Sequence, residues 1–243
     1  MSGIVRSRDG DTAPPLVTWS WGEAVALVVF AYVTGHLVRI LVLGDRTSPT
    51  ARVAERVVLE LVWIVVIVAW LRLRRIGWTT AFGRPARSWP EIRDGVVFGS
   101  ILYGAVALAV ALPISWLLGL ASDRPRHAPE PLPTALDPLG WALAVVLVLL
   151  LAPAAEELLF RGILFGGVRA RYGLTPGMVA SALAFGLVHY LPGDPLEIVT
   201  TVAAATAMGA GLAFQYERRG ILVAPLAAHV AFNALGLLIL LRA

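Results

Sequence analysis

The stretch Leu151–Gly167, LAPAAEELLFRGILFGG, combines the hydropathy of a membrane span with charges that a span rarely carries. It lies inside an apolar run that begins near residue 139, yet it contains Glu156, Glu157 and Arg161. A charged side chain at the centre of a bilayer costs about 2.5–3.5 kcal/mol on insertion scales, and such residues are usually paired and functional. These three charges therefore require a structural or chemical reason.

The composition is that of a membrane protein. Of 243 residues, 58% are hydrophobic and only 15% are charged, and the mean hydropathy is +0.78. A soluble domain of this length cannot bury so much apolar surface, so lipid must cover most of it. The absence of cysteine excludes disulfides and thiol catalysis. All basic residues are arginine, which together with the excess of Ala, Val, Leu and Gly we interpret as the codon bias of a bacterial genome.

Apolar segments of about 20 residues recur along the chain, the length that crosses a hydrocarbon core of about 30 Å. We predict spans at 21–43, 56–71, 95–120, 139–167, 176–193, 196–216 and 221–241. The second is short and a Pro-Gly turn alone separates the fifth from the sixth, which gives a range of six to eight. The expected fold class is all-α, a polytopic transmembrane helical bundle with an intramembrane polar cavity.

The domain organisation is correspondingly simple. Residues 1–18 are polar and are predicted to form a flexible N-terminal tail, and residues 19–243 a single transmembrane domain whose motif-bearing part is about 139–241. With the N-terminus in the cytoplasm, about twice as many arginines fall on the inner side as on the outer side, as the positive-inside rule requires. We therefore expect a multi-pass protein of a bacterial inner membrane. Arginines placed between spans set topology, and no nucleic acid is expected as a partner.

The charges of the opening stretch divide into a pair and a single carboxylate. Glu157 and Arg161 are spaced i,i+4 with the acid first, the favourable order for a pair on one helical face. Glu156 points about 100° away around the helix and has no partner on its own helix. Pro153 just before them is expected to loosen the helix and to free carbonyl groups that a neighbour or water must satisfy.

Two later spans contribute further polar residues at a similar depth. His189 ends the motif FGLVH, and His229 and Asn233 are spaced i,i+4 in HVAFN, so that they share a face. All lie within about 6 Å of the depth of Glu156 at a rise of about 1.5 Å per residue. We therefore predict that Glu156, His189, His229 and Asn233 line one cavity.

Each feature also has a structural explanation. Glu157–Arg161 can be an ion pair, His189 an interfacial or core histidine, and His229–Asn233 interhelical hydrogen-bonding groups. Glu60 in the second span is assigned to such a structural role. Taken together, however, a carboxylate without a local partner, two histidines and an amide resemble the site of a hydrolase. The carboxylate can act as a general base toward water, and the other groups can stabilise an oxyanion.

Three sequence blocks carry a family resemblance. EELLFRG (156–162), FGLVH (185–189) and HVAFN (229–233) match the pattern EExxxR, FxxxH and HxxxN, in that order and on separate spans. The chain thus resembles the CPBP intramembrane proteases, which include the type II CAAX prenyl endopeptidase and the bacterial Abi proteins. The blocks cover about 80 C-terminal residues.

The resemblance implies a cavity that opens to the cytoplasm and admits a lipidated or membrane-bound protein or peptide substrate from the bilayer. It implies that Glu156 is the base, that His189 helps to position the water, that His229 and Asn233 bind the oxyanion, and that Glu157 and Arg161 brace the site. It leaves two chemistries open: a metalloprotease, with zinc held by Glu156, His189 and His229, or a metal-free glutamate mechanism.

Two other classes of function use similar residues. A non-proteolytic scaffold, bacteriocin-immunity factor or regulator could use the same fold without turnover. A proton-coupled transporter could use intramembrane Glu and His as a relay, but the sequence lacks the paired broken helices of inverted-repeat transporters. The complete set of three blocks favours hydrolysis. The sequence does not indicate an oligomeric state.

Overall fold

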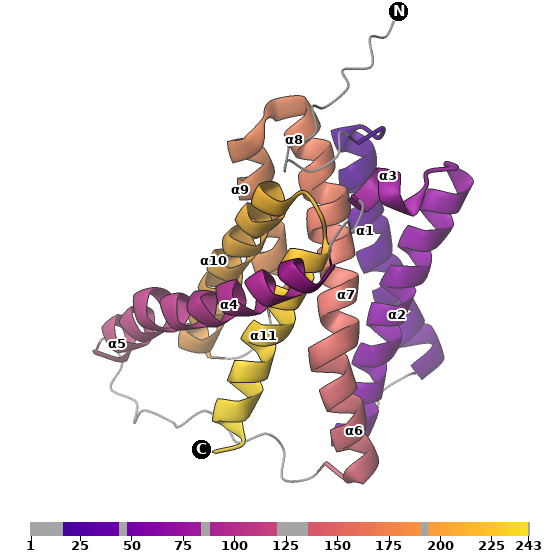
Figure 1. Cartoon of the computed structure of the whole chain (residues 1–243). Helices are drawn as coiled ribbons and strands as arrows, with labels where there is room; N and C mark the ends of the chain where they lie inside the picture. The colour runs from indigo at the N-terminus through magenta and orange to yellow at the C-terminus, as the bar shows by residue number, and fades with distance from the viewer. Residues whose placement is uncertain (1–16, 44–47, 84–87, 121–135, 191–193, 243) are drawn as a thin grey trace, which may run out of the picture.

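The computed structural model describes residues 17–43, 48–83, 88–120, 136–190 and 194–242. Within them the regular secondary structure is entirely helical (Figure 1). The helices are α1 (Trp21–Val38), η1 (Arg39–Leu43), α2 (Pro49–Leu73), α3 (Trp78–Phe82), α4 (Ser88–Val106), η2 (Ala107–Ala111), α5 (Leu112–Leu120), α6 (Pro138–Val146), η3 (Leu147–Leu151), α7 (Ala152–Glu156), η4 (Glu157–Phe165), α8 (Gly166–Tyr172), α9 (Leu174–Val188), α10 (Pro195–Arg219) and α11 (Val223–Leu240), where η denotes a π-helical turn. The predicted tail falls mostly on residues 1–16, outside the described part.

Each of the seven predicted spans corresponds to a continuous helical segment. Five of these are long and apolar enough to cross a membrane: 21–41, 89–117, 138–172, 195–219 and 223–240. The segment α9 is apolar but shorter. The segment α2 is longer than predicted, because Ser48 caps it and Pro49 begins it, so that a charged turn precedes the apolar part. The fold class is confirmed as an all-helical polytopic bundle.

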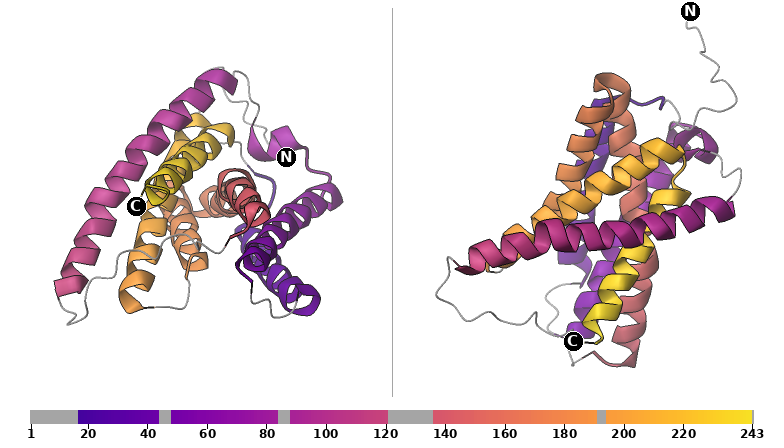
Figure 2. Two further views of the ribbon diagram at one scale, coloured as in Figure 1. Left: turned by 90° about the horizontal axis from the view of Figure 1, so that it is seen from below. Right: turned by 60° about the vertical axis from the view of Figure 1, so that its left-hand side comes forward.

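The long segment α6–α8 is the central element. Seen along the bundle, it lies between α1–α2 on one flank and α9, α10 and α11 on the other, and α4–α5 runs along the outside of α10 and α11 (Figure 2). From Ala155 to Val168 every residue of this segment is buried. Most of the stretch Leu151–Gly167 thus lies in the core of the fold.

Helix α4 crosses α11 at very close range because both present small residues. A Cβ atom added to Gly99 would lie 2.1 Å from the carbonyl oxygen of Ala228, and one added to Gly95 would lie 2.4 Å from that of Ala224. Small residues four positions apart on both helices let the two backbones touch, the usual way in which membrane helices associate. This crossing fixes α11, which carries His229 and Asn233.

The distribution of polarity suits a lipid environment. Large apolar side chains are exposed on the outer faces, for example Ile101 at 67% and Leu108 at 69%. The buried polar residues among those described are Glu60, Glu156, Glu157, Arg161, Ser181, Gln215 and His229. Charged groups in such a place must be paired with one another or line a hydrated cavity. The pairing is therefore the key to the site.

Candidate active site

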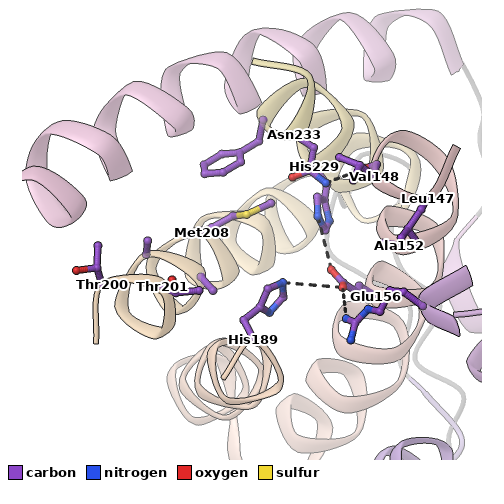
Figure 3. Close-up of a pocket in the computed structure, with 14 residues that line it drawn as sticks. Leu147, Val148, Ala152, Glu156, His189, Thr200, Thr201, Met208, His229 and Asn233 are labelled. Atoms are coloured by element: carbon purple, nitrogen blue, oxygen red, sulfur yellow. Dashed lines mark hydrogen bonds and ion pairs between the residues drawn. The ribbon is translucent and has the colours of Figure 1, made fainter. Parts of the chain in front are cut away.

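A cavity of about 480 Å³ reaches the middle of the central segment. Its lining includes Glu156 of α7, His189 after α9, and His229 and Asn233 of α11 (Figure 3). The prediction that these four side chains line one cavity is confirmed. Leu147, Val148, Ala152, Met208 and Phe232 are among the apolar lining residues, and Thr200 and Thr201 lie at the far end from Glu156.

Glu156 is the convergence point. Its side chain is only 3% exposed; Oε1 lies 3.9 Å from Nε2 of His189 and Oε2 lies 3.6 Å from Nε2 of His229. Both separations exceed a direct hydrogen bond, but one water molecule can contact the carboxylate and either ring. The side chain of His189 is 30% exposed, so this side of Glu156 faces the open part of the cavity.

The orientation of both histidines follows from their second ring nitrogen. Nδ1 of His189 donates to the carbonyl oxygen of Phe185 at 2.7 Å, and Nδ1 of His229 donates to Oε1 of Glu157 at 2.9 Å. Carbonyl and carboxylate oxygens can only accept, so a neutral ring carries its proton on Nδ1 and presents an Nε2 lone pair. Both lone pairs face Glu156, and a water molecule that donates its hydrogens completes this set of acceptors.

Glu157 and Arg161 form the predicted pair and extend it. Nε of Arg161 lies 3.3 Å from Oε2 of Glu157, and Nη2 donates to the carbonyl oxygen of Gly209 at 3.2 Å. The guanidinium also lies over the ring of Phe185, 4.3 Å from its centroid. Arg161 is fully buried. Arg161, Glu157 and His229 therefore form a continuous row in which Glu157 fixes the ring of His229. The two acids of EExxxR thus have different roles: Glu156 faces the cavity, and Glu157 orients His229.

Phe185 explains the first residue of the FxxxH block. Its carbonyl oxygen orients His189, and its ring packs against the rings of His189 and His229, with centroids 4.6 and 5.8 Å away. Because residues four apart lie on one face of a helix, the block places this buried ring beneath the active-site histidine. The ring and the backbone carbonyl of Phe185 thus contact three polar side chains of the site, His189, His229 and Arg161.

Asn233 satisfies a carbonyl that the central helix cannot. In η3 the N–H of Ala152 bonds to the carbonyl of Leu147, five residues back, so the next bond would join residue 153 to Val148. Residue 153 is proline and has no N–H, and Nδ2 of Asn233 donates to that Val148 oxygen at 2.9 Å. The predicted loosening at Pro153 is thus present, and a neighbouring helix satisfies the freed group. The second N–H of the amide remains for another acceptor.

Two residues of α2 join the site, and sequence reasoning missed both. Nη2 of Arg56 lies 3.9 Å from Oε1 of Glu156, and Nε lies 3.1 Å from Oε1 of the fully buried Glu60. From the sequence, Arg56 has no predicted role in the site and Glu60 only a structural one. Glu156 has no partner on its own helix, as predicted, but α2 supplies a cation. The i,i+4 spacing of Arg56 and Glu60 in an apolar segment was the available signal.

Glu156, His189 and His229, the residues that the resemblance offers as zinc ligands, lie together in the cavity. Converging acceptors could attract a cation, but the described residues contain no group of three or more His, Cys, Asp or Glu side chains arranged to hold a metal ion. Arg56 already places a positive charge beside Oε1 of Glu156, where a metal cation would meet repulsion. The residues present do not fit a zinc site.

Comparison with known proteins shows similarity to one family. Residues 138–235 match the family model described as type II CAAX prenyl endopeptidase Rce1-like. This part of the chain is similar to that family. The match covers the central segment and all three blocks, and the resemblance recognised from those blocks is confirmed. No curated protein and no solved structure matched the chain. Arg56 and Glu60 lie outside the matched residues, so α2 adds side chains to this site from elsewhere in the sequence.

Proposed function

We propose that the protein is an intramembrane endopeptidase that hydrolyses a peptide bond in a membrane-associated protein or peptide. The observation that carries the proposal is the arrangement around Glu156, where a buried carboxylate meets two imidazole Nε2 atoms at the inner end of a cavity. Three acceptors that converge at 3.6–3.9 Å suit a water molecule poised for attack. The Rce1-like match over the same residues supports proteolysis.

The reaction begins with water. Glu156 takes one proton while the water oxygen attacks the carbonyl carbon of the scissile bond, and His189 accepts a hydrogen bond from the same water. Asn233 uses its free N–H to donate to the oxyanion that forms. His229, which Glu157 orients, then takes the proton from Glu156 onto Nε2. It becomes an imidazolium that lies between the carboxylates of Glu156 and Glu157. As the carbon–nitrogen bond breaks, that proton passes to the leaving amine.

Arg56 reaches Glu156 from α2 and lies near Oε1, the carboxylate oxygen that also faces His189. Its side chain is 37% exposed, and its Nε lies 3.1 Å from Oε1 of Glu60, which limits the orientations that the guanidinium can adopt. A guanidinium 3.9 Å from Oε1 turns the carboxylate so that Oε2 faces His229. We assign Arg56 as a positioning residue and Glu60 as its support.

The orientation of the protein is part of the proposal. Arginines concentrate at the end of the bundle formed by α8 and the end of α10, and the positive-inside rule puts that end in the cytoplasm. With the arginine-only basic composition, this supports a multi-pass protein of a bacterial inner membrane. The partner would then be another membrane-anchored protein or peptide in the same bilayer.

The test compares the wild type with Glu156→Gln in the same cells. The substitution keeps size and hydrogen bonding but cannot take a proton from water, and loss of a general base typically lowers a rate by about 10²–10⁴-fold. The readout is the set of protein termini in the membrane proteome: termini present in the wild type should disappear in Glu156→Gln. Glu197→Gln, an exposed residue in the first turn of α10, is the matched control and should leave them unchanged.

The same strains separate an enzyme from a scaffold. A scaffold or immunity protein needs the fold and not the base, so Glu156→Gln would then restore the phenotype of a deletion strain. Full complementation by Glu156→Gln at wild-type protein levels, with an unchanged set of termini, would refute the protease proposal. Loss of complementation with normal accumulation of the variant supports it.

A further inference from the structure

The bundle has two distinct ends, which ionic contacts and packing define. At one end, the α8 end, Arg169 of α8 pairs with Glu217 of α10 at 2.6 Å. There Arg219 of α10 also pairs with Glu91 of α4 at 2.7 Å. The start of α1 joins this end, because Nε1 of Trp19 donates to the carbonyl oxygen of Ile163.

The opposite end, the α6 end, gathers the starts of α2, α6 and α10 with the ends of α9 and α11 (Figure 1). A Cβ added to Gly140 of α6 would lie 2.5 Å from Oγ1 of Thr50 in α2, so these two helix starts touch. The hydrogen bond from Asn233 to the carbonyl oxygen of Val148 joins the second half of α11 to the same region.

The cavity lies entirely on the α6 side of Glu156. Leu147, Val148 and Ala152 precede Glu156 in the central segment, which runs from the α6 end to the α8 end. Thr201 is six residues into α10, about 9 Å from its start at ~1.5 Å per residue, and Asn233 lies just past the middle of α11. No residue of the central segment beyond Glu156 is among the cavity lining.

On the α8 side, packing closes the way to Glu156. Every residue from Glu157 to Val168 is buried, including the ion pair of Glu157 and Arg161. A path from the α8 end would have to displace that pair and the rings packed on it. On the α6 side, by contrast, Thr201 is exposed, and the side chains of Arg56 and His189 are 37% and 30% exposed. Access to the base is therefore one-sided.

The charge distribution assigns a side of the membrane to each end. The described arginines of the α8 end are Arg72, Arg74, Arg75, Arg93, Arg169, Arg171, Arg218 and Arg219. Those of the α6 end are Arg39, Arg52 and Arg242, since Arg56 and Arg161 lie within the site. Arginine close to the ends of spans is retained in the cytoplasm. The arginine-rich α8 end is then cytoplasmic and the α6 end lies on the other side.

We propose that the cavity opens at the extracytoplasmic face, so that the substrate is a membrane-anchored protein or peptide whose cleavable segment reaches the bilayer from that side. This rests on the proposed function and adds the side of access. It differs from the expectation drawn from the family resemblance, a cavity open to the cytoplasm. That expectation and a cytoplasmic α8 end cannot both hold, because the cavity and the arginines lie at opposite ends.

Because the chain contains no cysteine, single cysteines can test this directly in the full-length protein. Ala170→Cys reports on the α8 end and Leu241→Cys on the α6 end, and both native residues are exposed. Thr201→Cys and Ala204→Cys report on the cavity. Leu108→Cys, on an exposed apolar face of η2, is the control for a position that faces lipid. Intact cells are treated with a membrane-impermeant maleimide, before and after permeabilisation.

The expected result is labelling of Leu241→Cys, Thr201→Cys and Ala204→Cys in intact cells, labelling of Ala170→Cys only after permeabilisation, and none of Leu108→Cys. The inference is overturned if both cavity cysteines label only after permeabilisation, if neither labels at all, or if Ala170→Cys labels in intact cells. Two cavity positions guard against one variant that misfolds.

Repeating the labelling with Glu156→Gln separates this inference from the proposed function. Labelling depends on access and not on turnover, so a protein that fails the cleavage test can still show an outward-facing cavity. The converse result is cleavage that depends on Glu156 in a protein whose cavity cysteines label only after permeabilisation. That result would support the protease proposal and reject extracytoplasmic access.

Discussion

Removing Arg161 should destabilise the protein far more than removing the whole ion pair. Arg161 is fully buried and contacts Glu157, the carbonyl oxygen of Gly209 and the ring of Phe185. Arg161→Met fills a similar volume but leaves Glu157 charged and buried. Breaking a buried pair in this way typically costs about 3–5 kcal/mol, and His229 still donates to Glu157. We therefore expect a loss of about 3 kcal/mol, against a total stability of about 5–15 kcal/mol for a folded domain.

The double variant Glu157→Gln, Arg161→Met removes both charges, and the new amide oxygen can still accept from His229. It should recover at least half of the loss, because no uncompensated charge remains buried. The measurement is the thermal unfolding midpoint of purified protein in detergent, with the folded yield from size-exclusion chromatography. Arg171→Met, an exposed position on α8, is the control and should be neutral. Equal midpoints for the single and the double variant would refute the reasoning, as would a wild-type midpoint for Arg161→Met.

Three further predictions address other contacts. Gly99→Ala should destabilise the fold by about 1–3 kcal/mol through overpacking and so lower the unfolding midpoint, because its Cβ would meet the α11 backbone at 2.1 Å. Gly104→Ala on the same helix segment has open space around the new Cβ and should leave the midpoint unchanged. Equal effects of the two substitutions would contradict the close crossing. Arg56→Gln should lower the turnover number with little change in KM, and Arg56→Lys should restore part of it; a change confined to KM would indicate substrate binding instead of positioning. Asn233→Ala should cost about 1–3 kcal/mol, since the Val148 carbonyl loses its partner, and should lower turnover by about 10²–10³-fold; full activity would remove Asn233 from the oxyanion site.

The sequence alone predicted the helical bundle because hydropathy acts over a whole span. A run of about 20 apolar residues has few alternatives in a bilayer, where each backbone polar group must be satisfied within the helix. Each predicted span therefore corresponds to a helix. Helix boundaries were less certain where a charged turn continues a helix, as at the start of α2. An apolar run ends at the first charge, whereas the helical backbone continues through it.

The part of the site that depends on spacing within single helices was predictable from the sequence. The pair of Glu157 and Arg161 and the shared face of His229 and Asn233 are local i,i+4 relations, and equal depth brought the four cavity residues together. The hydrogen bond from His229 to Glu157 was not predictable, because it joins residues 72 positions apart. The capping of Val148 by Asn233 joins residues 85 positions apart.

Only the tertiary structure decided which helix stands beside Glu156 and on which side the cavity lies. Nothing in the spacing along α2 places Arg56 against Glu156; that contact exists because α2 packs on α6 and α7. The side of access depends on which half of the central segment its neighbours cover, and they bury the half beyond Glu156 completely. Depth in the membrane follows from each helix by itself, whereas neighbours and openings follow from how helices pack, and the sequence of one helix does not encode its partner.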